Sequence, residues 1–95
     1  MNLQELEKRV QEQQRVDLAL ILRKSHDYSG PDDCIRNISD YGFLGILVRL
    51  SDKLSRIKNI YKSAASVDDE TVMDTLMDIR NYAHLGQVIY EEEKK

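Results

Sequence analysis

Apolar residues recur along this chain at alternating steps of three and four, which is the spacing of one face of an α-helix. The clearest run predicts a helix over about residues 43–62, with an apolar stripe at Phe43, Leu47, Leu50, Leu54, Ile57 and Tyr61. A second stripe predicts a helix from about residue 70 to residue 92, with its apolar side at Val72, Leu76, Ile79 and Ala83. A third set of apolar residues predicts an earlier helix over about residues 3–24.

The connections between these helices differ in character. Residues 26–33 are turn formers, and the Ile35, Ile38 and Tyr41 that follow predict an ordered, anchored loop before the second helix. Residues 63–69 predict a tighter turn, with Asp68 or Asp69 as the N-cap of the third helix. Residues 11–15 are polar on all sides, so residues 1–15 are candidates for a projecting or intersubunit helix. The charged end, 91–95, should fray.

Composition narrows the fold class. The 95 residues are 41% hydrophobic and 33% charged, with one proline and four glycines, which favours a single helical domain over residues 1–95. Three helices cannot easily cover every apolar face in so short a chain. We therefore expect an all-α fold: a small three-helix bundle with an ordered loop between helices 1 and 2, completed by oligomerisation.

Charge and targeting signals point to a cytoplasmic protein. The net charge of −3 gives no general attraction to duplex nucleic acid or to an anionic membrane. The single Cys34 excludes an internal disulfide framework. The first residues lack the apolar core of a signal peptide, and no apolar run approaches the roughly 18 residues of a membrane span. The expected location is the cytosol, which is the host cytosol if a phage encodes the chain.

Three carboxylates form an acidic line in the third predicted helix. Glu70, Asp74 and Asp78 are four residues apart and therefore lie on one face. This line is either a solvated surface or a site for a cation or a hydrogen-bonding ligand. Mg²⁺ is one such cation, because it favours oxygen ligands.

The second predicted helix carries a mixed-charge face of its own. It groups Arg49, Asp52, Lys53 and Arg56, offset by roughly a third of a turn from the apolar stripe. This face is either an exposed, salt-bridged surface or an edge that binds phosphate, for which Arg and Lys are suited. Tyr28 and Tyr82 could stack on a base or could be ordinary packing residues.

These blocks resemble the nucleotide modification associated domain 1 family, which consists of small, largely helical proteins common in phages. The resemblance spans about residues 16–90 and rests on Asp27-Tyr28, on the segment 45–56, and on Asp69-Glu70 with Asp74, Asp78, Asn81 and Tyr82. It implies a link to nucleotides. A more distant similarity is to the MazG-like nucleotide pyrophosphohydrolases, whose two acidic helices jointly hold Mg²⁺. Where that family needs carboxylates on the earlier helix, this chain retains Asp52 among basic residues, a departure that favours binding over hydrolysis.

The leading hypothesis is a cofactor-free, phage-type protein that binds a nucleotide, cyclic nucleotide or nucleotide-derived signal without turnover, as a homo-oligomer. Its expected ligand-binding residues are Tyr28, Arg49, Asp52, Lys53, Arg56, Asp74, Asp78, Asn81 and Tyr82. Sequestration of a host immune nucleotide would fit this chemistry. One alternative is a Mg²⁺-dependent pyrophosphohydrolase that uses Asp52, Glu70, Asp74 and Asp78. A second alternative is a helical protein-interaction module.

Overall fold

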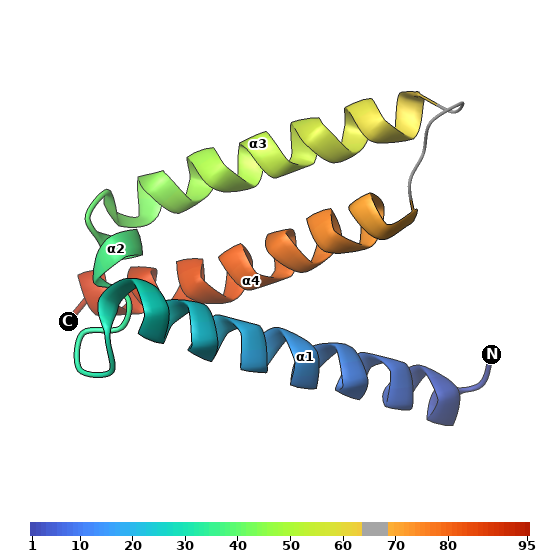
Figure 1. The fold of residues 1–95 in the computed structure, drawn as a ribbon, viewed down its shortest axis with the longest axis horizontal. Helices are drawn as coiled ribbons and strands as arrows, with labels where there is room; N and C mark the ends of the chain where they lie inside the picture. Colours follow the sequence, from blue (N-terminus) through green and yellow to red (C-terminus); the bar gives the residue numbers. More distant parts are fainter. Residues whose placement is uncertain (64–68) are drawn as a thin grey trace. The chain divides into compact units, whose positions relative to one another are not determined.

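The computed structural model describes residues 1–63 and 69–95, and within these ranges all regular structure is helical. The helices are α1 (Leu3–Ser29), α2 (Arg36–Ser39), α3 (Gly42–Lys62) and α4 (Asp69–Glu93) (Figure 1). The all-α prediction is confirmed. The chain divides into two compact units, residues 1–35 and 36–95, and each is described by itself.

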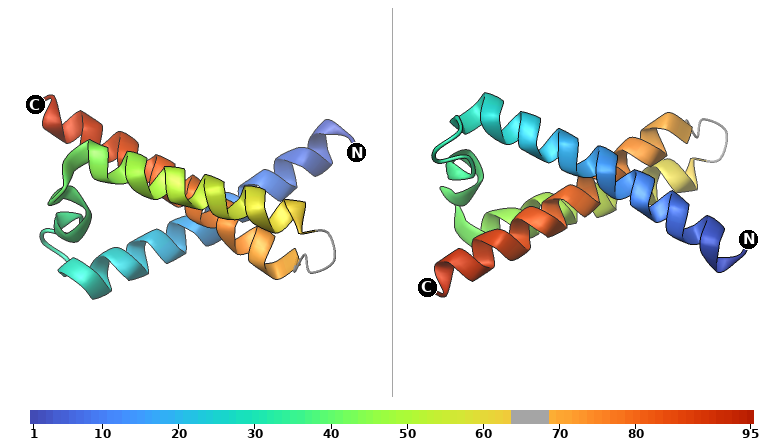
Figure 2. Two further views of the ribbon diagram at one scale, coloured as in Figure 1. Left: turned by 90° about the horizontal axis from the view of Figure 1, so that it is seen from above. Right: turned by 90° about the horizontal axis from the view of Figure 1, so that it is seen from below.

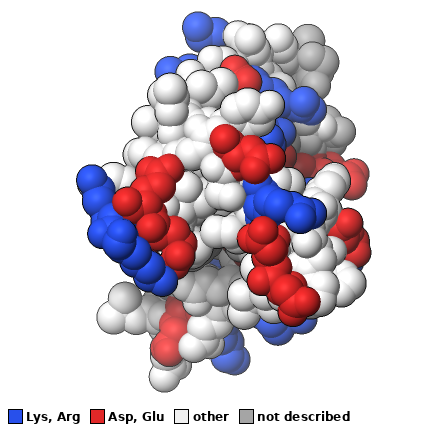
Figure 3. All heavy atoms as spheres, turned by 90° about the vertical axis from the view of Figure 1, so that its left-hand side faces the viewer, with Lys and Arg blue, Asp and Glu red and all other residues white. Residues whose placement is uncertain are grey.

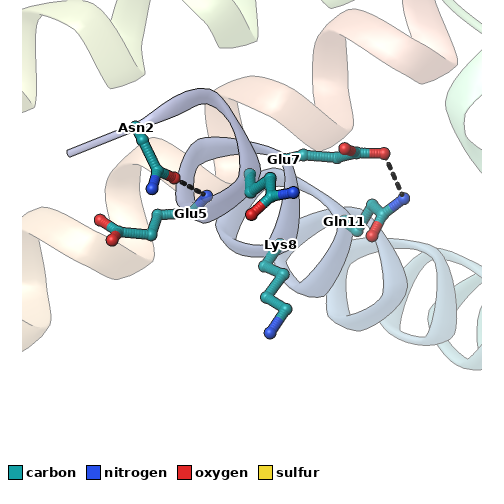
Figure 4. A pocket seen from close by; sticks show the side chains of 6 residues that line it. Asn2, Glu5, Glu7, Lys8 and Gln11 are labelled. Atoms are coloured by element: carbon teal, nitrogen blue, oxygen red, sulfur yellow. Dashed lines mark hydrogen bonds between the residues drawn. The ribbon is translucent and has the colours of Figure 1, made fainter.

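The first unit consists of α1 and the residues that flank it. Asn2 caps the helix, because its Oδ1 accepts a hydrogen bond of 2.9 Å from the Glu5 backbone N–H (Figure 4). The helix ends at Gly30, whose φ of 82° suits a residue without a Cβ and whose N–H donates to the His26 carbonyl. The helix is therefore five residues longer than predicted, because the turn formers before Gly30 continue it.

The second unit is built on a helical hairpin. α3 and α4 run antiparallel, side by side, in every view (Figures 1 and 2). The short α2 packs on α3. α4 begins at Asp69, one residue before its predicted start, and the alternative N-cap Asp68 lies outside the described residues. Within the described residues, no helix is long and apolar enough to cross a membrane.

The core of the hairpin lies where α3 and α4 approach most closely. Ile46 and Ile89 are each 1% exposed. Gly86 permits the approach: a Cβ at this position would lie 2.9 Å from Ile46 Cγ2. Phe43 and Tyr90 pack edge to face beside them, with ring centroids 5.2 Å apart. A small residue on one helix thus accommodates a β-branched residue on the other.

The face of α3 that meets α4 is rotated from the predicted stripe. Leu47 and Leu54 are exposed rather than buried, and Tyr61 is 81% exposed. The buried position is instead Ile46, on the side where Arg49 and Lys53 follow. Close packing at Gly86 draws this side toward α4, and the two charged side chains find polar partners there.

The predicted stripe of α4 is displaced in the same way. Leu76 and Ala83 are exposed, whereas Thr75, Gly86 and Ile89 are buried. The Thr75 hydroxyl donates a 2.7 Å hydrogen bond to the Thr71 carbonyl, so this buried polar group is satisfied within its own helix. Small and weakly polar residues thus occupy part of the buried side that hydrophobic periodicity assigns to larger apolar ones.

The end of α4 closes on the start of α3. The Phe43 backbone N–H donates a 2.9 Å hydrogen bond to Glu93 Oε1, which satisfies a helix-terminal donor that Tyr41 leaves uncapped. Gly42 makes room for this contact, since a Cβ there would lie 2.7 Å from the same carboxylate oxygen, and its φ is 64°. In the predicted anchored loop, Ile35 and Ile38 are partly buried. Tyr41, however, is 78% exposed, so its assignment as an anchor is wrong.

Candidate ligand-binding site

The hairpin brings four of the predicted site residues together. Lys53 Nζ on α3 lies 2.9 Å from Asp78 Oδ2 on α4. One helical turn away, Arg49 Nη1 donates a 3.2 Å hydrogen bond to the Tyr82 hydroxyl, and its Cζ lies 5.6 Å from the centre of the tyrosine ring. The two pairs form one polar row across the helix interface.

Helix geometry explains why these residues meet. Arg49 and Lys53 are four apart on α3, and Asp78 and Tyr82 are four apart on α4, so each pair shares a face. Because the helices are antiparallel, the earlier residue of one faces the later residue of the other. The same register places Gly86 against Ile46, so the polar row continues the packed core.

The two cations of the row have partners of different charge. Lys53 and Asp78 are 29% and 30% exposed, and an ion pair this accessible to water contributes about 0.2–1 kcal/mol to stability. Arg49 is exposed and its partner is a neutral phenol. No ion pair between described residues involves Arg49. Its positive charge therefore stays available to an anion, whereas the charge of Lys53 is compensated.

The remaining predicted residues lie outside this row. Asp52, Arg56 and Asp74 are exposed. Asn81 is partly buried, and among the described residues nothing pairs with its Oδ1. Tyr28 is an exposed residue of α1, in the other unit, so its predicted stacking role stays a prediction.

The acidic line is divided along α4. Glu70 and Asp74 are exposed, while Asp78 pairs with Lys53. Over the described residues, the structure gathers no three Asp, Glu, His or Cys side chains into a cluster that could hold a metal ion. The quartet proposed for the hydrolase alternative, which adds Asp52, is therefore not assembled.

A groove that the sequence did not suggest begins at Arg49. It has a volume of about 370 Å³ and runs along the first turns of α3, lined by Tyr41, Leu44, Gly45, Val48 and Arg49. Gly45 shapes it, since a Cβ there would lie 2.8 Å from Tyr41 Cβ. The signal in the sequence was the four-residue spacing of Tyr41, Gly45 and Arg49, but Tyr41 was assigned to the anchored loop and only Arg49 to a charged face of the helix.

Two other hollows lack such a combination of groups. An apolar groove of about 370 Å³ runs between α3 and α4, lined by Phe43, Ile46, Leu50, Ala83, Gly86, Gln87 and Tyr90. The hollow at the start of α1 is formed by polar residues of that helix and its cap, and Figure 4 shows their side chains pointing to different sides. Both acidic and basic side chains are exposed on the face drawn in Figure 3.

No protein-family model, curated protein or solved structure matches this chain. The resemblance to the nucleotide modification associated domain 1 family therefore stays a prediction.

Proposed function

We propose that this protein binds a nucleotide or a nucleotide-derived signal without turning it over, with Arg49 as the principal phosphate contact. The observation that carries this proposal is the position of Arg49 at the meeting point of the polar row and the groove of α3. A nucleotide needs such a junction, because it joins an anionic phosphate to a flat, largely apolar base.

The chemistry of the groove suits both halves of such a ligand. The Arg49 guanidinium can donate two parallel hydrogen bonds to a phosphate. The exposed Tyr41 ring offers a surface on which a base can stack, an interaction of about 1–3 kcal/mol per base. The volume of about 370 Å³ falls within the range of small-molecule sites, about 300–1,000 Å³. Leu44 and Val48 supply the apolar wall.

Binding without turnover is favoured by the arrangement of the carboxylates. Hydrolysis of a phosphate ester needs groups that activate water and stabilise the charge that develops. Of the four carboxylates considered for this role, Asp78 already pairs with Lys53, and Asp52, Glu70 and Asp74 are exposed to solvent. We therefore assign Asp78 to the ion pair with Lys53 rather than to catalysis.

The biological setting follows from the resemblance. A small phage protein that holds a nucleotide without consuming it would lower the free concentration of a host immune signal. We also propose that the protein self-associates. The exposed side chains Leu47, Leu54 and Tyr61 on α3 support this, because they lie seven residues apart on one helix face outside the groove, and exposed apolar surface of this kind is typical of protein–protein contacts.

The test is a thermal-shift panel of mononucleotides, cyclic dinucleotides and dinucleotide-derived signals, with and without Mg²⁺, followed by chromatography of the ligand. A binder at 100 times its dissociation constant adds about 2.7 kcal/mol to the free energy of unfolding. We expect a shift with at least one ligand, the same with and without Mg²⁺, and recovery of the ligand unchanged.

A matched pair of variants ties binding to the site. Arg49→Ala should weaken binding at least tenfold. Lys58→Ala removes a positive charge from an exposed position nine residues along α3, on the opposite side of the helix, and should leave binding unchanged. Absence of any shift across the panel would overturn the proposal. Release of pyrophosphate or monophosphate would instead favour the pyrophosphohydrolase.

A further inference from the structure

The polar row contains two cations that a phosphate could use, and they are not equivalent. Arg49 is exposed and contacts the neutral hydroxyl and ring of Tyr82. Lys53, one turn further along α3, lies 2.9 Å from the Asp78 carboxylate. An anion that binds Arg49 does not compete with a carboxylate, because the partner of Arg49 is the uncharged Tyr82 side chain. An anion that arrives at Lys53 must compete with a carboxylate already in place.

We propose that Asp78 sets the charge selectivity of the site by holding Lys53. This inference rests on the proposed nucleotide binding and names the class of ligand: those with a single phosphate group at the point of contact, in preference to di- and triphosphates. A single phosphate bound at Arg49 does not need a contact with Lys53. Further phosphates that extend along the row meet the negative charge of Asp78, and the Lys53 charge that would offset them is already compensated.

The register of the hairpin places this ion pair next to the phosphate contact. Residues four apart on a helix are neighbours on its surface, with Cβ atoms about 5–6 Å apart. The second and third phosphates of a chain held at Arg49 can therefore reach the Lys53–Asp78 pair. The pair is about 30% exposed, so a ligand can approach it and water screens it only in part.

Adenosine mono-, di- and triphosphate are suitable probes, because they share one base and differ in phosphate charge. We expect Asp78→Asn, which keeps the shape of the side chain, to tighten triphosphate binding about fivefold or more. Binding of the monophosphate should change by less than about twofold, so that the gain grows with ligand charge.

Asp74→Asn is the matched control. It changes the net charge by the same amount, one turn earlier on α4, at an exposed carboxylate outside the ion pair. It should leave the order of the three affinities as in the unmodified protein. The double variant Lys53→Gln with Asp78→Asn tests whether tighter triphosphate binding comes from the freed charge of Lys53 or only from the loss of repulsion by Asp78. If the freed charge of Lys53 is the cause, the double variant should lose most of the gain in triphosphate affinity. Circular dichroism of each variant checks that the helices are intact.

The outcomes distinguish this inference from the proposed function. If the unmodified protein binds a nucleotide and Asp78→Asn acts no differently from Asp74→Asn, or gains equally for all three probes, the selectivity inference is overturned and the binding function stands. If only Asp78→Asn binds, the selectivity inference is supported and the proposed function of the unmodified protein falls. If no protein in the set binds any probe or any other ligand of the thermal-shift panel, both are overturned.

Discussion

The fit of Ile46 against Gly86 predicts a substitution whose effect on stability reverses sign with its neighbour. In Gly86→Ala the new Cβ would lie 2.9 Å from Ile46 Cγ2, closer than a stable contact allows, and 3.6 Å from Phe43 Cε1. The Cγ2 atom is fixed to a β-branched side chain that has little rotamer freedom in a helix. Relief of the clash therefore requires the two helices to move apart.

Two opposing terms set the size of the effect. Overpacking of a well-packed interface costs about 1–3 kcal/mol, whereas alanine is favoured over glycine in a helix interior by about 1 kcal/mol. We expect Gly86→Ala to lower the free energy of unfolding by about 1 kcal/mol in the unmodified protein. In an Ile46→Ala background the Cγ2 atom is gone, and the same substitution should raise it by about 1 kcal/mol. The coupling between the two sites is then about 2 kcal/mol.

Urea unfolding of the four proteins, followed by far-ultraviolet circular dichroism, measures this coupling. Ile46→Ala alone should cost about 2–5 kcal/mol, toward the lower end because an open groove adjoins the site. Ile46→Val is the control background, since it keeps Cγ2 and should leave Gly86→Ala destabilising. If Gly86→Ala has the same effect in the unmodified and Ile46→Ala backgrounds to within about 0.5 kcal/mol, the close contact is not what constrains this position.

Two further predictions concern charged groups. Glu93→Ala should remove the hydrogen bond to the Phe43 N–H and destabilise the hairpin by about 0.5–1.5 kcal/mol, while Glu93→Gln keeps an acceptor and should cost less; equal losses in urea unfolding would contradict the contact. On α1, the hydrogen bond and charge of Arg15 hold the pKa of Glu12 below its ordinary value of 4.5. Any stability from this pair is therefore present above the unfolded-state pKa and is lost as the pH falls through the folded-state pKa. Arg15→Gln should raise the Glu12 pKa in an NMR titration, and an unchanged value would refute the pairing.

The positions of α3 and α4 were predictable from the sequence, whereas the short α2, the last five residues of α1 and the faces by which α3 and α4 meet were not. The predicted starts and ends of α3 and α4 lie within a residue of the observed ones, because apolar periodicity and flanking turn formers are local signals. Which side of α3 is buried depends on α4: Gly86 admits Ile46, and Asp78 offers Lys53 a partner. Hydrophobic periodicity alone predicts that charged positions such as Lys53 face the solvent.

The members of the polar row were predictable from the sequence, but their arrangement and the adjoining groove were not. The sequence selected the four members of the polar row, Arg49, Lys53, Asp78 and Tyr82, without indicating which would pair. It did not select Tyr41, because the positive φ at Gly42 that starts α3 directly after it is a backbone property with no periodic signature. A residue expected to anchor a loop is thus exposed at the groove instead.

One line of residues along α4 joins these observations. Positions 70, 74, 78, 82 and 86 follow one another in steps of four, and because each step turns by about 40°, this line winds around α4 and changes in character from one end to the other. Glu70 and Asp74 are exposed, Asp78 forms an ion pair, Tyr82 contacts Arg49, and Gly86 admits Ile46. Contact with α3 is therefore charged toward one end of the line and tightly packed at the other. The carboxylate at the boundary, Asp78, stabilises the hairpin through the same Lys53 that a phosphate chain would use. Any gain in affinity for polyphosphates through loss of Asp78 should for this reason accompany a loss of hairpin stability, by about 0.2–1 kcal/mol.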